Sequence, residues 1–251
     1  MRVAVVIPSH RRAPVGLPRW LSQGEVSRVV VIWNADGPPP PMPGATILRQ
    51  PWQGHGPTRQ AALAHVHEPF VLFTVDDALP LRPDVVSAMV AALVAGPFEA
   101  VVARQLPWAW SSQTTRRRLA AWTPWASAPT AFPQADHVAT LYRSDTLREN
   151  PLPAEPIGED LAWSQGRRVG MAPAAVVLHA HRADPIEAYR RERALHALRR
   201  RLGLPPTVSH PAGLLAALPA ALADAARSGP REGLTRLTEA LGQWRGGRPP
   251  G

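Results

Sequence analysis

Short apolar runs that end at polar or turn-forming residues recur through the first two thirds of the chain. Each run is rich in Val, Ile, Leu or Phe and is bounded by turn signals, so it predicts a buried strand. Seven stretches have this character: 2–7, 28–33, 46–49, 71–75, 99–105, 138–143 and 174–178. Helical patterns and capping residues lie between them, over 17–23, 58–67, 83–95 and 159–169. Strands that alternate with helices predict an α/β fold of three layers, α/β/α, around a Rossmann-like, mostly parallel mixed sheet.

The pattern changes after the last predicted strand. Apolar residues then recur only at helical spacing, and residues 184–202 predict an Arg-rich helix. Two more helices follow, separated at Gly229-Pro230. We therefore expect one α/β domain over residues 1–182 and a helical C-terminal extension over residues 183–251.

Composition narrows the classes of protein. A chain of 251 residues with 45% hydrophobic residues can form one sizeable domain with a core. The absence of Cys excludes disulfides and thiolate zinc sites, and no apolar run approaches the length of a membrane span. The first residues predict a strand rather than a signal peptide, so we expect a soluble, cytoplasmic protein.

Charge adds a second constraint. The net charge is +9, and all 28 basic residues are Arg. The guanidinium group matches phosphate oxygens, which favours phosphate-bearing partners, although richness in Arg, Ala and Pro can also reflect a biased genome. The absence of Lys removes a Walker-type phosphate loop and Schiff-base chemistry from consideration.

A pair of carboxylates, Asp76 and Asp77, directly follows the run at 71–75. At the carboxyl end of a buried strand, such residues lie at the mouth of an open α/β sheet, where ligands bind. Adjacent carboxylates repel each other unless a cation lies between them, and oxygen ligands favour Mg²⁺ or Mn²⁺, which commonly bridge nucleotide phosphates. The simpler interpretation is that both are solvated turn residues, and the pair alone does not decide between the two.

Four motifs follow one another along the chain: Val-Ile-Pro8-Ser-His-Arg, Gly56-Pro-Thr-Arg59-Gln60-Ala-Ala, Phe-Thr-Val-Asp76-Asp77-Ala-Leu-Pro and Gly158-Glu159-Asp160-Leu-Ala-Trp. In order and spacing they resemble the family 2 glycosyltransferases of the GT-A fold. The family's corresponding patterns are a P-x-x-N loop, G-x-x-x-A-R-N-x-A, D-D-D-x-x-P and an E-D acceptor-side motif. Gln60 stands where the family has Asn, and Val75 where it has the first Asp.

The resemblance implies a metal-dependent transferase with a nucleotide-binding half over 1–105 and an acceptor half over 106–182. The nucleotide-binding residues it implies are Pro8, Ser9, Arg11, Asn34, Asp36, Arg59 and Asp76. Asp77 would ligate Mg²⁺ or Mn²⁺, with Asp76 acting through water or holding the ribose. His179 would complete the metal site, and His181 is an alternative ligand.

The resemblance also assigns the acceptor side. Asp160 would be the base that takes the proton of the acceptor hydroxyl, and Glu159 would position acceptor or base; the alternative is that both merely stabilise a helix N-terminus. The long stretch 106–135 has no clear periodicity, so we expect it to be functional or disordered. Its tryptophans suit sugar rings as well as a core, and the acceptor residues that we expect are Trp108, Trp110 and Trp163.

The function that we expect is therefore transfer of a sugar, hexosyltransferase-like, from a nucleotide-diphosphate sugar to a sugar, lipid-linked or small-molecule acceptor, by inversion. A nucleotidyltransferase on a similar sheet and a non-catalytic nucleotide- or nucleic-acid-binding protein are the alternatives. Carboxylates at the strand mouth would repel a polyanion, which disfavours nucleic acid. The Arg-rich C-terminal helices could contact the inner face of a membrane or be solvated and packed on the core.

Overall fold

The computed structural model describes residues 1–10, 12–180, 184–205, 207–208 and 212–247, so Arg11 and His181 lie outside the described residues. The chain divides into two compact units. The first, here called the sheet unit, comprises residues 1–108 and 119–179, and the second, the helical unit, comprises 109–118 and 180–251. The predicted boundary at 182/183 falls among residues that are not described and stays a prediction.

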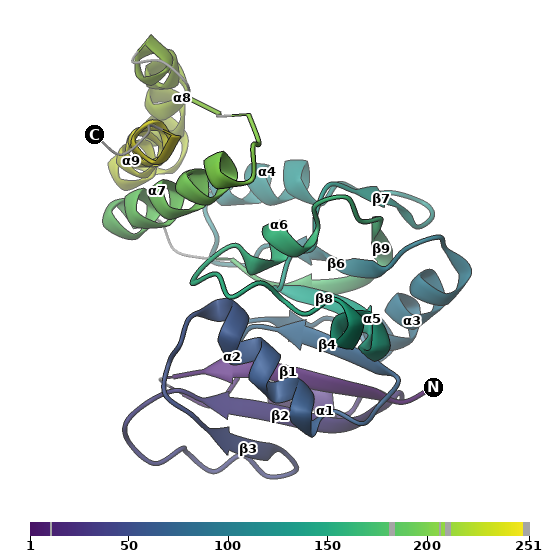
Figure 1. Cartoon of the computed structure of the whole chain (residues 1–251). Helices are drawn as coiled ribbons and strands as arrows, with labels where there is room; N and C mark the ends of the chain where they lie inside the picture. Colours follow the sequence, from purple (N-terminus) through teal and green to yellow (C-terminus); the bar gives the residue numbers. More distant parts are fainter. Residues whose placement is uncertain (11, 181–183, 206, 209–211, 248–251) are drawn as a thin grey trace. The chain divides into compact units, whose positions relative to one another are not determined.

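The strands of the sheet unit form one mixed sheet (Figure 1). They are β1 Val3–Ser9, β2 Val26–Trp33, β3 Thr46–Arg49, β4 Phe70–Thr74, β5 Leu79–Pro80, β6 Ala100–Leu106, β7 Thr130–Phe132, β8 Ala139–Arg143 and β9 Val169–Leu178. Their order is β3-β2-β1-β4-β8-β6-β9-β5, and β7 also pairs with β9. Strand β8 is antiparallel to both β4 and β6, whereas β1, β2, β3, β4, β6 and β9 run in one direction. The carboxyl ends of these six strands therefore share one edge.

Helices cover both faces of this sheet. They are α1 Leu17–Leu21, α2 His55–Ala62, the 3₁₀ helix η1 Leu63–His65, α3 Val85–Ala95, α5 Ser144–Glu149 and α6 Glu159–Trp163, with α4 Gln113–Trp122 beginning in the helical unit. Alternate residues of β1 point to opposite faces. Val5 joins a core cluster with residues of α1 and α3, and Val6 joins a second with residues of α2, α5 and α6. Three layers with a mixed, mostly parallel sheet are confirmed.

Two local predictions differ from the structure. The helix expected over 159–169 ends at Trp163, because Gly166 adopts a positive φ of 72° that an α-helix cannot contain, and the chain enters β9 at Val169. The last strand therefore begins five residues before the predicted start at 174. The stretch 106–135 is partly regular, with α4 and β7, although its sequence shows no clear period.

The helical unit contains α7 Pro185–Arg201, α8 Ala212–Ser228 and α9 Pro230–Gly247. Helix α9 packs against both α7 and α8 (Figure 1). A Cβ atom at Gly242 would lie 2.5 Å from the carbonyl oxygen of Tyr189, and one at Gly246 would collide with that of Arg193. Glycines at these positions therefore allow α9 to approach the backbone of α7. Among the described residues, no helix is long and apolar enough to cross a membrane.

Candidate functional site

The ends of β1 and β4 hold Asp76 in place. Strands β1 and β4 are parallel neighbours, so the residues after them meet at one edge of the sheet. The buried Ser9 hydroxyl lies 3.0 Å from Asp76 Oδ2 and 2.7 Å from the carbonyl oxygen of Arg12. The backbone N–H of Val15 donates to the carbonyl oxygen of Asp76 at 2.8 Å. The loop after β1 therefore fixes both the backbone and the carboxylate of Asp76.

The end of β2 lies beside the end of β1. The backbone N–H of Asn34 donates to the Ser9 carbonyl oxygen at 2.9 Å, and its side-chain amide donates to the carbonyl oxygen of Gln50 at 3.1 Å. Asp36 is exposed in the following turn, and Pro8 is half-buried within β1. The structure thus gathers Pro8, Ser9 and Asn34 at one edge of the sheet, with Asp36 just beyond.

Asp77 and His179 are brought together by the short strand β5. Leu79 pairs with Leu178 of β9 in antiparallel register, so Asp77 and His179 flank this pair on the same side. Nε2 of His179 lies 3.5 Å from Asp77 Oδ1. His179 is buried, whereas the Asp77 side chain is 23% exposed. Two residues 102 positions apart in the sequence therefore form one potential ligand pair.

The other nitrogen of His179 is held by Gln105. Nδ1 lies 3.2 Å from Gln105 Oε1, and the Gln105 amide nitrogen donates to Asp136 Oδ2 at 2.7 Å. Because the carboxylate of Asp136 can only accept, it orients the amide so that Oε1 faces the ring. Nδ1 must then carry a proton, and Nε2, on the other side of the ring, faces Asp77. Metal-ligating histidines show the same arrangement of a donated outer N–H.

These residues fit a hard divalent cation. The described residues contain no group of three or more His, Asp or Glu side chains that could hold an ion by themselves. Mg²⁺ and its relatives are commonly bound through one or two carboxylates together with substrate phosphates and water. Asp77 and His179 therefore fit a metal site in which the phosphates of a bound nucleotide supply the remaining ligands.

A second cluster surrounds Glu159 at the start of α6. Glu159 Oε1 accepts from Arg59 NH1 and from His137 Nδ1, both at 2.8 Å, and the side chains of Arg59 and Glu159 are each 3% exposed. Nε2 of His137 lies 2.8 Å from the hydroxyl of Tyr142. Nδ1 of His55 lies 3.3 Å from Arg59 NH1. This buried ion pair ties α2 to α6 and to the loop before β8.

The same contacts shift several pKa values. Burial alone would raise the pKa of Glu159, but the hydrogen bond and charge of His137 and the charge of Arg59 outweigh it and lower the pKa from 4.5 to about 2. Burial, with the charge of Arg59, lowers the pKa of His55 to about 4. Burial, with the charges of Asp160 and Glu159, raises the pKa of Tyr142 well above its usual value. At neutral pH the cluster therefore contains an ionised Glu159, a neutral His55 and a neutral Tyr142.

Asp160 differs from its neighbour. Its Oδ1 accepts from the backbone N–H of Leu161 at 2.8 Å, and its Oδ2 accepts from that of His137 at 3.2 Å. The residue is only half-buried, yet desolvation and the nearby charges of Glu159 and Asp136 raise its pKa. Adjacent carboxylates thus have opposite shifts, a pattern found where two acids take different roles.

The two clusters are connected through Asp136 and His137. Asp136 binds the amide of Gln105, which holds His179, and its Oδ2 also accepts from Trp122 Nε1 at 2.7 Å. The next residue, His137, contacts both acids of the second cluster. The loop before β8 therefore links the Asp77 side of the site to the Asp160 side.

The remaining predicted residues have varied environments. Arg59 is committed to Glu159, and its predicted contact with a diphosphate stays a prediction without support from its position. Trp163 is buried in the core, where Nε1 donates to the carbonyl oxygen of Asn150, so it has little surface for an acceptor. Trp108 is half-buried and Trp110 is exposed.

Four residues of the site were missed at the sequence level: Gln105, Asp136, His137 and Tyr142. One signal was present, since Asp136 and His137 form a polar pair directly before the run at 138–143, as Asp76 and Asp77 directly follow a strand. Nothing in the sequence singles out Gln105 or Tyr142, because each lies within a strand whose apolar pattern dominates.

Comparison with known proteins identifies the fold of this chain. No protein-family model matches the sequence, and no curated protein matches it significantly. Among solved structures, the mannosyltransferase PcManGT from Pyrobaculum calidifontis, in complex with GDP-Man and Mn²⁺, matches with a TM-score of 0.65 at 19% identity, over 96% of this chain and 85% of that one. Glucosyl-3-phosphoglycerate synthase from Mycobacterium tuberculosis, in complex with Mn²⁺, UDP-Glc and phosphoglyceric acid, matches with a TM-score of 0.55 at 16% identity, over 83% and 82%. TarS from S. aureus, in complex with UDP-GlcNAc, matches with a TM-score of 0.53 at 14% identity, over 78% and 66%. This chain therefore has the GT-A-like fold of these glycosyltransferases.

Proposed function

We propose that this protein is a metal-dependent glycosyltransferase that moves a sugar from a nucleotide-diphosphate sugar to an acceptor hydroxyl. The proposal rests mainly on one observation: Asp77 Oδ1 lies 3.5 Å from His179 Nε2, at the edge of the sheet where the parallel strands end. Proteins of the same fold in complex with Mn²⁺ and a GDP- or UDP-linked sugar support this class of donor.

Asp77 and His179 would hold Mg²⁺ or Mn²⁺, with Asp76 acting through water or on the ribose. The bound cation neutralises the charge that develops on the diphosphate leaving group. Ser9 keeps the Asp76 carboxylate in position for either contact. Gln105 keeps the ring of His179 oriented so that Nε2 faces Asp77, where it would bind the cation.

The nucleoside would lie across the ends of β1 and β2. Pro8, Ser9 and Asn34 lie together there, and Asp36 follows in an exposed turn. The crevice outside the carboxyl ends of parallel strands is the usual ligand site of open α/β sheets.

Asp160 would act as the base. The acceptor oxygen bonds to the anomeric carbon while the bond from that carbon to the diphosphate oxygen breaks, and the hydroxyl proton passes to Asp160, with inversion. The raised pKa makes its carboxylate a stronger base than an ordinary Asp. Glu159 is a positioning residue, because it anchors His137, whose backbone N–H holds Asp160.

The test is a thermal-shift panel of nucleoside diphosphates and nucleotide sugars, with and without Mn²⁺ or Mg²⁺. Ligand at about 100 times its Kd adds about 2.7 kcal/mol of stability, which is measurable as a rise in Tm of several degrees. We expect a metal-dependent rise for one nucleotide, lost in Asp77→Asn and kept in Asp84→Asn, a matched change at an exposed aspartate. A folded protein that no nucleotide stabilises would contradict the proposal.

A further inference from the structure

The two units carry very different charges. The sheet unit contains 13 Arg and 13 acidic residues and is neutral overall. The helical unit contains 15 Arg and 6 acidic residues, so the whole net charge of +9 belongs to it. A charge of this sign, concentrated on a small helical unit, favours an anionic partner that is distinct from a nucleotide bound at the sheet edge.

One face of α8 is exposed and apolar. Leu215, Leu218 and Leu222 are 68%, 41% and 70% exposed. Their spacing of three and four residues places them on a single side of the helix. No charged residue occurs in α8 before Asp224. We call these three residues the leucine face.

Helix α8 packs within the unit through a different side. Ala221 is buried, and a Cβ atom at Gly233 of α9 would lie 2.6 Å from the Ala221 carbonyl oxygen, so the two helices are in close contact there. The leucine face therefore is not the side that builds the small core of the helical unit. Apolar side chains of this size, gathered and exposed, mark a site of interaction.

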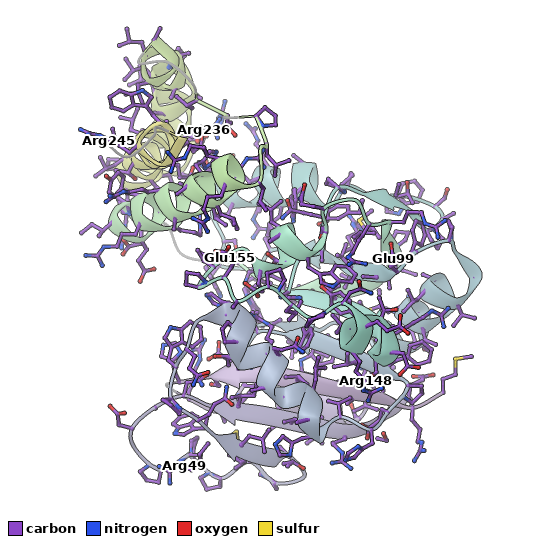
Figure 2. All side chains as sticks on the ribbon, viewed as in Figure 1. Arg49, Glu99, Arg148, Glu155, Arg236 and Arg245 are labelled. Carbon is purple, nitrogen blue, oxygen red and sulfur yellow. The ribbon has the colours of Figure 1, made fainter. Side chains whose placement is uncertain are left out.

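Arginines occur beyond the leucine face, from the C-terminal end of α8 into α9. Arg227 is in the last turn, and Arg231 is in the first turn of α9, with a side chain that is 66% exposed. Thr114 bonds to Asp224 and Ser228, which brings the exposed Arg117 to the same end of the unit. Arg236 and Arg245 lie further along α9 (Figure 2).

We propose that the helical unit docks on an anionic phospholipid surface through the leucine face. Leucines on one side of a helix enter the boundary between headgroups and acyl chains, and flanking arginines bind the anionic headgroups. The charge of the unit complements such a surface, and a face of three leucines suits a shallow interface. This docking is independent of the proposed transfer reaction, since it uses no residue of the sheet edge.

The test uses the full chain and sedimentation with vesicles. Vesicles of phosphatidylcholine alone are compared with an equal mixture of phosphatidylcholine and phosphatidylglycerol, at about 0.05 M and about 0.5 M salt. The variant Leu215→Glu/Leu222→Glu places two charges on the leucine face. The control variant Leu81→Glu/Val94→Glu places two charges at exposed apolar positions of the sheet unit.

We expect binding to the anionic vesicles only, weakened at least tenfold by high salt and at least tenfold by the leucine-face variant, with the control variant unchanged. Circular dichroism verifies that each variant is folded. Equal binding of the leucine-face variant, or no binding to anionic vesicles, would overturn the proposal. A wild-type dimer in sedimentation velocity that the leucine-face variant dissociates, without vesicle binding by either, would assign the face to a second copy of the chain instead.

Discussion

The ion pair between Arg59 and Glu159 gives a quantitative prediction for Glu159→Gln. The substitution keeps the shape of the side chain and removes its charge. The pKa of Glu159 is lowered from 4.5 to about 2, and each unit corresponds to 1.36 kcal/mol, so ionised Glu159 contributes about 3 kcal/mol to the free energy of unfolding. Breaking one side of a buried ion pair costs about 3–5 kcal/mol, which agrees. We expect Glu159→Gln to lower the free energy of unfolding at neutral pH by about 3 kcal/mol.

The loss should depend on pH with a defined sign. Because the folded-state pKa is lowered, the contribution of Glu159 is complete at pH values well above 4.5 and is lost as the pH falls toward about 2. The difference between wild type and Glu159→Gln should therefore be constant from neutral pH to about pH 5 and should narrow below it. Urea titrations followed by circular dichroism at a series of pH values measure this difference.

Two further variants make the test specific. Glu149→Gln removes the charge of an exposed glutamate in the same unit and should change the free energy of unfolding by no more than about 0.5 kcal/mol. Adding Arg59→Met to Glu159→Gln removes the buried cation that the single substitution leaves without its carboxylate, and should recover part of the loss. A loss below about 1 kcal/mol for Glu159→Gln, or a difference that widens in acid, would show that the ion pair does not stabilise the fold in this way.

Three more outcomes follow from the site and its support. Gln105→Leu removes the hydrogen bond that orients His179, so it should weaken Mn²⁺ binding about 10–100-fold. Electron paramagnetic resonance of free Mn²⁺ measures this affinity. An unchanged affinity would show that Gln105 does not support the metal site. Asp160→Asn should reduce donor turnover, measured as release of nucleoside diphosphate, about 10²–10⁴-fold. Nucleotide binding in the thermal-shift panel should be retained. Turnover equal to that of wild type would exclude Asp160 as the base. Gly56→Ala should lower Tm, because its Cβ would collide with the Pro153 carbonyl oxygen; an unchanged Tm would show that the 153–156 segment shifts freely.

The sequence predicts well which residues lie where the parallel strands end, because each is marked by a short local pattern. The strand at 46–49 and the polar residues after β1, β2 and β4 follow from short apolar runs that end abruptly. The same logic places Asp77 at the mouth of the sheet. It also places His179 after a strand, but not beside Asp77, because their approach depends on two paired residues of β5, Leu79 and Pro80.

The Glu159 cluster could not be predicted, for a related reason. Arg59 and Glu159 are 100 residues apart, and His137 is 22 residues from Glu159. No periodicity or spacing relates them; only the packing of α2 and α6 on the same face of the sheet brings them together. In this cluster Arg59, the expected diphosphate ligand, is buried and paired with a carboxylate.

Strand β9 has a consequence for the synthesis of the protein. It pairs with β5, β6 and β7, and it ends at the residue before His179. During translation, about 100 residues separate the emergence of Asp77 from that of His179, or roughly 5–20 s at typical rates of elongation. Until β9 emerges, β5, β6 and β7 of a nascent chain lack this common partner, and only Asp77 of the proposed ligand pair is present. A product released early by the ribosome would thus be incompletely folded and would also lack one of the two proposed metal ligands.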